Sequence, residues 1–263
     1  MQSKKWMASG VMLTALLSGL TGCGGSVDAE VDDVAVPELP QGIWRGTVGT
    51  DTVSVIVLPT ASPSAGELWS IGRDSLGGTR LLKADVALDG NAFVGTGSLL
   101  SSSPTGITPN VSVSAAGAGD PLSSLSFTLG SDSANLSFAG YYADSATLAD
   151  WTGQWQNSQT LGSAGTLLTT WTVSAEGVIS GERSDGCVYQ GNIALRPEAK
   201  AVVDIEVEET CASTTVTSTT VDFRGIGSPG VNGEGNVVGR IVTLLRADGQ
   251  SFSLLLFSPA TPP

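Results

Sequence analysis

Short runs of alternating apolar and polar residues, separated by turn-forming residues, recur along most of this chain. Clear examples are Thr52–Leu58, Leu82–Leu88, Leu167–Val173 and Val203–Val207. When apolar and polar residues alternate one by one, successive side chains lie on opposite faces of a strand. The chain also contains 34 glycines, with many serines and threonines in its turns. We therefore expect an all-β fold with very little helix.

The clearest hairpin signal lies near the C-terminus. Asp248-Gly249 separates the runs Arg240–Ala247 and Gln250–Phe257. Asp-Gly readily adopts the two positive φ angles of a type I′ turn, which joins neighbouring antiparallel strands. The sequence therefore predicts a two-residue turn at this position.

A Gly-x-Trp pattern occurs twice and divides the body of the chain into halves. Trp44 and Trp155 each lie two residues after a glycine, just before a series of strand patterns. We expect two antiparallel modules, each a small barrel or sandwich, joined by a link that contains one helical turn. The expected ranges are 41–142 for the first module, 143–150 for the link, 151–258 for the second module and 259–263 for a tail.

The Gly-x-Trp pattern resembles the first-strand motif of lipocalins and the wider calycin group. In that family the tryptophan closes one end of a barrel, and an arginine from the last strand lies over its ring. The resemblance implies this role for Trp44 and Trp155, with Arg246 or Arg240 over the Trp155 ring. Such a cation–π contact contributes about 0.5–2 kcal/mol. A tryptophan that is simply buried at the start of a strand is the alternative interpretation.

The N-terminus has the organisation of a secretory signal. Lys4 and Lys5 precede the uncharged stretch Trp6–Leu20, and small residues follow. The apolar stretch is shorter than the roughly 20 residues that a membrane-spanning helix needs. The segment Leu20–Cys23 (LTGC) resembles the lipobox of bacterial lipoproteins, in which a leucine and small residues precede a cysteine.

The lipobox resemblance implies cleavage after Gly22 and attachment of lipid to Cys23. Several acyl chains on one residue hold such proteins stably on a membrane. The residue after the cysteine is Gly24, not the aspartate that retains lipoproteins at the inner membrane in enteric-type sorting, which implies the outer membrane of a bacterial envelope. Residues 1–22 are then a signal peptide, and residues 23–40 form a lipidated, disordered acidic tether.

The charge of the chain restricts its partners. The formal charge is −13, and removal of Lys4 and Lys5 with the signal peptide takes it to −15. This argues against nucleic acid, which requires a basic face, and against electrostatic attachment to anionic lipid. The partners we expect are the membrane, through the lipid anchor, and either a small ligand or an envelope protein.

Two of the three cysteines remain once Cys23 carries lipid, namely Cys187 and Cys211. An even pair in an oxidising compartment predicts a disulfide bond. Two free buried thiols are the alternative. The bond would close a loop of about 25 residues, worth about 3.5 kcal/mol in the chain-entropy model.

The chain contains no histidine, which excludes Ser-His-Asp and Cys-His catalysis and histidine metal sites. The densest acidic cluster is Asp204, Glu206, Glu208 and Glu209. Alternation places the first three opposite an apolar face, as expected for a solvated strand face. We therefore expect no catalytic residue, no metal and no cofactor.

Two classes of function remain. The first is a non-enzymatic binding or scaffold lipoprotein that holds a ligand in a barrel mouth or docks an envelope protein. The alternative is a carboxylate-dependent hydrolase of polysaccharide or peptidoglycan. Two acids from different strands that converge in a cleft with displaced pKa values would favour the hydrolase, whereas exposed acids would favour the binding protein.

The Cys23→Ala variant tests the anchor. Loss of the thiol should leave the protein unprocessed or released from the membrane, because no acyl chain can then be attached to that residue. Labelling cells with radioactive palmitate and fractionating their membranes measures both effects. Normal labelling and membrane retention of the variant would count against the anchor.

Overall fold

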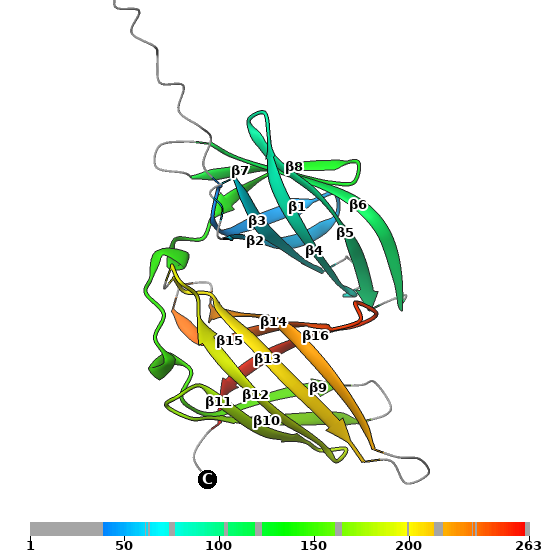
Figure 1. The fold of residues 1–263 in the computed structure, drawn as a ribbon, viewed down its shortest axis with the longest axis vertical. Helices are drawn as coiled ribbons and strands as arrows, with labels where there is room; N and C mark the ends of the chain where they lie inside the picture. The colour runs from blue at the N-terminus through cyan, green and yellow to red at the C-terminus, as the bar shows by residue number, and fades with distance from the viewer. Residues whose placement is uncertain are drawn as a thin grey trace, which may run out of the picture. The chain divides into compact units, whose positions relative to one another are not determined.

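The chain folds into two closed antiparallel β-barrels of eight strands each (Figure 1). This computed structural model describes residues 39–60, 62, 64–73, 77–102, 105–118, 123–160, 165–198, 200–212, 218–232, 234 and 236–260. The expected signal peptide, the lipid-attachment site at Cys23 and most of the tether lie outside these residues. The all-β expectation is confirmed, and both modules are barrels, not sandwiches.

The first barrel contains the first eight strands in chain order. These are β1 (Gly42–Val48), β2 (Asp51–Pro59), β3 (Ala65–Arg73), β4 (Thr79–Asp89), β5 (Ala92–Ser102), β6 (Thr105–Ala118), β7 (Ser124–Leu129) and β8 (Asp132–Phe138).

The second barrel contains the remaining eight strands. These are β9 (Gly153–Thr160), β10 (Thr166–Val173), β11 (Val178–Arg183), β12 (Cys187–Leu195), β13 (Val203–Cys211), β14 (Thr219–Val231), β15 (Val237–Arg246) and β16 (Phe252–Pro259).

Each barrel is an up-and-down meander in which every strand pairs with the next along the chain. The first barrel closes where β1 pairs with β8, and the second closes where β9 pairs with β16. Within the described residues, closure pairs the first and last strands of each sheet and so limits the free edge on which another chain could pair. The short spacing between runs in the sequence follows from this order, because hairpin turns join the strands.

The first barrel is filled by apolar side chains that point inward from its alternating strands. Trp44, Val55, Leu68, Phe93 and Phe127 are all buried in one hydrophobic cluster. An eight-stranded barrel is just wide enough for side chains to fill its interior. The interior of the first barrel therefore forms the core of that module.

The second barrel has an interior of mixed character. Trp171, Ile205, Val242 and Phe257 belong to its buried apolar cluster. Trp171 packs against Phe257, with ring centroids 4.7 Å apart. Polar side chains occupy the neighbouring part of the interior, beginning with Thr169, which is 3% exposed. One end of this barrel is therefore apolar and the other polar.

The link between the barrels contains two short 3-10 helices, η1 (Gly140–Ala143) and η2 (Leu148–Asp150). Thr147 and Asp150 form a capping box at the start of η2. Trp151 follows directly and packs over Gly227 of β14, where an added Cβ would lie 2.4 Å from the indole ring. Among the described residues, no helix has the length and apolar character needed to cross a membrane.

The hairpin between β15 and β16 is present, but the expected two-residue turn is wrong. The ladder ends at Leu245 and Phe252, and beyond it the backbone N–H of Arg246 donates to the carbonyl oxygen of Ser251 at 2.9 Å. The backbone N–H of Gly249 donates to the carbonyl oxygen of Arg246 at 2.8 Å, so the turn begins at Arg246. Gly249 has a φ of 70°, whereas Asp248 does not have a positive φ. The connection is therefore a longer loop and not a type I′ turn.

The disulfide between Cys187 and Cys211 is confirmed. The two cysteines lie directly opposite each other on the paired strands β12 and β13. The bond joins neighbours that the sheet already holds together, and it links residues 24 apart in the sequence. It therefore restricts the unfolded chain over β12, β13 and the loop between them.

Replacing both cysteines in Cys187→Ser/Cys211→Ser should lower the free energy of unfolding by about 3.5 kcal/mol. The loss should be confined to the second barrel, because both bonded strands belong to it. Hydrogen exchange followed by mass spectrometry measures the change separately for peptides of each barrel. An equal loss of protection in β1–β8 would show that the barrels do not unfold independently.

Candidate functional site

The apolar end of the second barrel is closed by two tryptophans under one arginine. Arg240 of β15 lies over the ring of Trp155 at 5.1 Å and over the ring of Trp151 at 5.3 Å. Its guanidinium also donates a hydrogen bond to the carbonyl oxygen of Asp150 in η2. Burial lowers the pKa of Arg240. The arginine over Trp155 that the resemblance implied is therefore present, on the next-to-last strand.

The expectation that Arg246 fills this role is wrong. Arg246 forms a surface ion pair with Asp248, at 3.0 Å, and its side chain is 42% exposed. Arg240 and Arg246 share one face of β15, but six residues separate them, and Arg246 is the last residue of the strand. Of the two, Arg240 is the one that lies over Trp155.

Trp44 lies buried in the first barrel, and no arginine in the described part of the chain lies over its ring. The ring packs edge-on against Phe138, with centroids 5.0 Å apart. Its indole N–H donates to the carbonyl oxygen of Pro40, and the indole N–H of Trp155 donates to the carbonyl oxygen of Trp151. In both cases the acceptor lies four residues earlier in the chain. The two Gly-x-Trp segments therefore share a local structure and differ in the residue that covers the ring.

We expected the strand face at Asp204, Glu206 and Glu208 to be exposed to solvent, and this holds for only part of it. Glu206 and Glu208 are exposed. Asp204 differs, because it forms an ion pair with Arg196, which is itself 9% exposed and also binds Glu67 of β3 at 2.8 Å. Burial raises the pKa of Asp204, and the charge of Arg196 acts in the opposite direction. Arg196 thus joins acids of both barrels, which belong to one compact unit.

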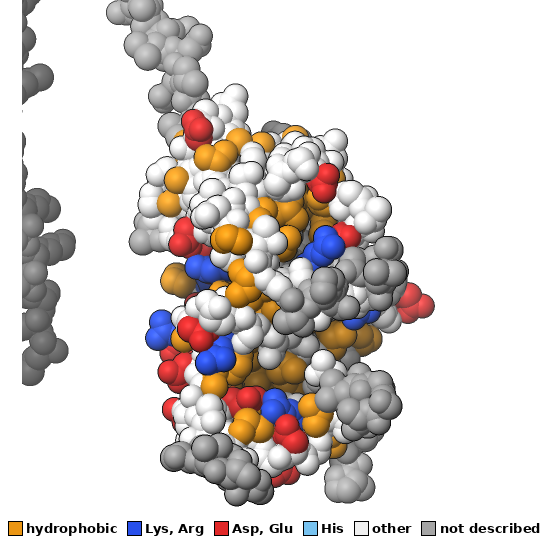
Figure 2. Space-filling view, turned by 90° about the vertical axis from the view of Figure 1, so that its right-hand side faces the viewer, with side chains coloured by type: hydrophobic (Ala, Val, Ile, Leu, Met, Phe, Trp, Pro, Cys, Tyr) orange, Lys and Arg blue, Asp and Glu red, His pale blue; other side chains and the backbone are white. Residues whose placement is uncertain are grey.

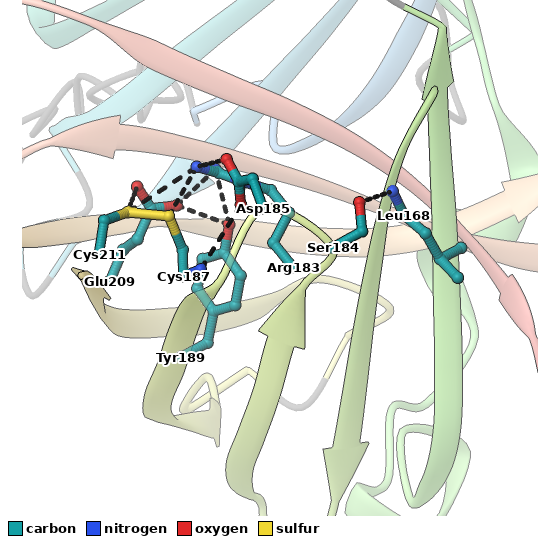
Figure 3. A network of polar contacts seen from close by, with 8 residues as sticks. All are labelled: Leu168, Arg183, Ser184, Asp185, Cys187, Tyr189, Glu209 and Cys211. Carbon is teal, nitrogen blue, oxygen red and sulfur yellow. Dashed lines mark hydrogen bonds and ion pairs between the residues drawn. A yellow bond between two sulfur atoms is a disulfide. The ribbon is translucent and has the colours of Figure 1, made fainter. Parts of the chain in front are cut away.

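The polar end of the second barrel contains a cluster around the disulfide, which Figure 3 shows from close by. Arg183 on β11 binds Asp185 at 2.8 Å and Glu209 on β13 at 2.8 Å. The Tyr189 hydroxyl on β12 donates to Glu209 Oε2 at 2.5 Å and accepts from Arg183 at 3.0 Å. An Arg183 N–H also lies 2.9 Å from the sulfur of Cys187. We name Arg183, Asp185, Tyr189 and Glu209 the arginine cluster.

Protonation states in the arginine cluster follow from its contacts. Hydrogen bonding to Asp185 raises the pKa of Arg183, and the same bond lowers the pKa of Asp185. Burial raises the pKa of Tyr189, and its hydrogen bond to Glu209 raises it further. Near neutral pH, Arg183 and Asp185 are therefore charged and the Tyr189 hydroxyl keeps its proton.

A cavity of about 580 Å³ opens at this polar end. Its walls within the second barrel are Gln159, Thr169, Arg183, Tyr189, Glu209, Phe223, Leu244 and residues 250–255. Residues 79, 100–102, 106 and 107 of the first barrel complete its rim. In the space-filling view, hydrophobic side chains lie recessed below the surface, with charged side chains at their border (Figure 2).

The wall of the second barrel is weakest beside this cavity. The ladder between β9 and β16, both described throughout, consists of Gln156 with Ser258 and Trp155 with Pro259. Beyond these pairs, the amide of Asn157 donates to the carbonyl oxygen of Leu256 at 3.0 Å. The buried side-chain amide of Asn157 thus takes the place of a backbone hydrogen bond between β9 and β16. This junction borders the cavity.

Cys187, Glu209 and Cys211 place three potential metal-binding atoms within 4.8 Å of one another. Metals bind the thiolate form of cysteine. Both sulfurs are committed to the disulfide, so they offer no thiolate in this state. In this state the three residues form a disulfide beside the carboxylate of Glu209 and not a metal site.

The sequence contained part of the signal for the arginine cluster. Pairing Cys187 with Cys211 fixes the register of β12 against β13 and places Tyr189 opposite Glu209. The parity of both strands then turns both side chains into the barrel. Arg183 was missed, because its position depends on how β11 pairs with β12.

Comparisons with models of protein families, with curated proteins and with solved structures found no match to this chain.

The variants Arg240→Met and Arg246→Met form a matched pair. Arg240→Met should lower the free energy of unfolding by about 1–3 kcal/mol, because it removes two cation–π contacts and a hydrogen bond. Arg246→Met should change it by less than about 0.5 kcal/mol, because it breaks one exposed ion pair. Urea unfolding followed by tryptophan fluorescence measures both. Equal effects of the two substitutions would contradict the assignment of Arg240.

Proposed function

We propose that this chain is a lipid-anchored protein of the bacterial envelope that binds a small molecule in the polar end of its second barrel, without catalysis. The observation that carries the proposal is the cavity at the arginine cluster. Ligand cavities in proteins typically measure about 300–1,000 Å³ and combine apolar walls with a few convergent polar groups. The cavity has both features.

The walls of the cavity support a binding role. Phe223, Leu244 and Leu255 provide apolar surface, and Thr169, Tyr189 and Glu209 provide polar atoms. Thr169 and Tyr189 are almost fully buried, and strands on both sides hold them in place. Side chains that are ordered before a ligand arrives reduce the entropy cost of binding.

The location rests on the N-terminal sequence. The resemblance of Leu20–Cys23 to a lipobox favours acylation of Cys23, and Gly24 favours the outer membrane. The acidic segment that follows would serve as a spacer between the membrane and the barrels. A protein held in this way can meet ligands in the periplasm or outside the cell.

The alternative, a carboxylate-dependent hydrolase, has one observation in its favour. Asp204, with its raised pKa, and Glu67 both lie beside a second cavity of about 570 Å³. A general acid must pass its proton to the substrate, however. One nitrogen of Arg196 contacts an oxygen of each carboxylate, so both acids are held in ion pairs, and the charge of Arg196 opposes the effect of burial on the pKa of Asp204. The binding function is therefore better supported, and hydrolysis of peptidoglycan by the purified protein would reverse that preference.

The variant Ser253→Trp tests the cavity. Ser253 lies on β16 in the cavity wall, and an indole there would fill space that a ligand needs. We expect the neutral apolar dye N-phenyl-1-naphthylamine to bind the wild type with increased fluorescence, and to bind Ser253→Trp at least about tenfold more weakly.

Ser258→Trp is the control, because Ser258 is exposed on the same strand and does not line the cavity. It should bind the dye as the wild type does. Equal dye binding by all three proteins would place the dye elsewhere and remove the support for this cavity. Absence of dye binding by the wild type would count against the proposed function.

A further inference from the structure

The guanidinium of Arg183 has no N–H group left for a ligand. Its Nε donates to Asp185 Oδ1, and its Nη2 donates to Asp185 Oδ2 and contacts the sulfur of Cys187. Its Nη1 donates to Glu209 Oε2 and to the Tyr189 hydroxyl. A guanidinium carries five N–H groups, so these contacts use all of them. Although Arg183 lines the cavity, it is not an anion-binding group.

Glu209 has an acceptor that its neighbours do not use. Its Oε2 accepts from both Arg183 and Tyr189. Within the described part of the chain, the polar contact of Oε1 is the Cys211 sulfur at 3.5 Å. That sulfur belongs to the disulfide and has no hydrogen to donate. Oε1 therefore receives no hydrogen from the residues that the structure describes, and its side chain is only 15% exposed.

The charge of the arginine cluster is also unbalanced. One guanidinium faces two carboxylates, Asp185 and Glu209, which leaves one excess negative charge. The Tyr189 hydroxyl stays protonated and adds none. Arg183 and Glu209 are the charged residues among those that line the cavity in the described part of the chain. The local field therefore favours a cation.

The opposite wall of the cavity is apolar. Phe223, Leu244 and Leu255 point inward from three consecutive strands, and Ile107 of the first barrel lies at the rim. Burial of each CH₂ group of a ligand against such a wall is favourable. A ligand that fits both walls has an apolar chain and one positively charged, hydrogen-donating end.

We propose that the cavity binds a protonated amine with an apolar chain, with the ammonium group donating to Glu209 Oε1. This inference rests on the proposed function, since it names the ligand class of the same cavity. Ammonium groups carry three donors and no acceptor, so they match an unused carboxylate oxygen. A carboxylate or phosphate ligand would meet Oε1 with no donor in return from Arg183.

Three probes with the same chain test the ligand class, namely octylamine, octanoate and 1-octanol at neutral pH. Displacement of N-phenyl-1-naphthylamine and isothermal titration calorimetry measure their affinities. A charge-assisted hydrogen bond should make octylamine bind about 10- to 100-fold more tightly than 1-octanol. Octanoate should bind more weakly than 1-octanol.

Two variants locate the effect. Glu209→Gln keeps the shape of the side chain and removes its charge, and should reduce the preference for octylamine over 1-octanol to about threefold or less. Glu208→Gln removes the same charge from the exposed face of the same strand and should keep the wild-type preference. Circular dichroism checks that both variants fold. The wild-type comparison needs no variant, so an unstable Glu209→Gln would not remove the test.

The remaining outcomes separate the two proposals. Equal binding of the three probes, or tighter binding of octanoate, would overturn the amine inference and leave the binding function in place. Loss of the preference in Glu208→Gln would assign it to the overall negative charge, and would also overturn the inference. Failure of every probe and of the dye to bind would overturn the proposed function itself.

Discussion

Closure of an eight-stranded sheet gives each barrel an interior of fixed and small volume. The interior must hold every side chain that points inward from the strands, and it is just wide enough for these side chains to fill. In the first barrel, apolar residues such as Trp44, Leu68 and Phe127 fill it. In the second barrel, apolar packing is interrupted beyond Trp171 and Phe257 by the cavity that Phe223, Leu244 and Leu255 line on one side. The polar end at this cavity is where a ligand can compete for space.

A charged residue inside a barrel needs partners that are as firmly placed as it is. Arg183 obtains them from its own turn, through Asp185, and from β13, through Glu209. The disulfide fixes β13 against β12, which also carries Tyr189. The strands that the disulfide holds are thus the strands that present the polar groups of the cavity, so the stability of this region and the geometry of the candidate site depend on the same bond.

The sequence predicted the features that depend on local pattern. Alternation identified the strands, and an even pair of cysteines identified the disulfide. The features that it missed depend on register between strands. Arg240 and Arg246 have the same parity on β15, but six residues of strand separate them by roughly 20 Å, and only pairing with β16 decides which one meets Trp155. Asp204 likewise lies at a position of its strand where alternation predicts an exposed side chain, but it forms an ion pair with Arg196. The alternation of residues along a strand does not indicate such a contact with a residue outside the strand.

Access to the cavity follows from how the second barrel closes. Seven of its eight strand junctions have ladders of five to nine residue pairs, whereas the junction between β9 and β16 has two pairs and the buried amide of Asn157. The ladder there is the shortest of this barrel, although the N–H of Ala260 also donates to the carbonyl oxygen of Gln154, so local opening should begin at this seam. Because Gln159 and Leu254 lie both on the seam strands and in the cavity wall, such an opening would admit a ligand. The disulfide, on the paired strands β12 and β13, would meanwhile hold Glu209 and Tyr189 in place.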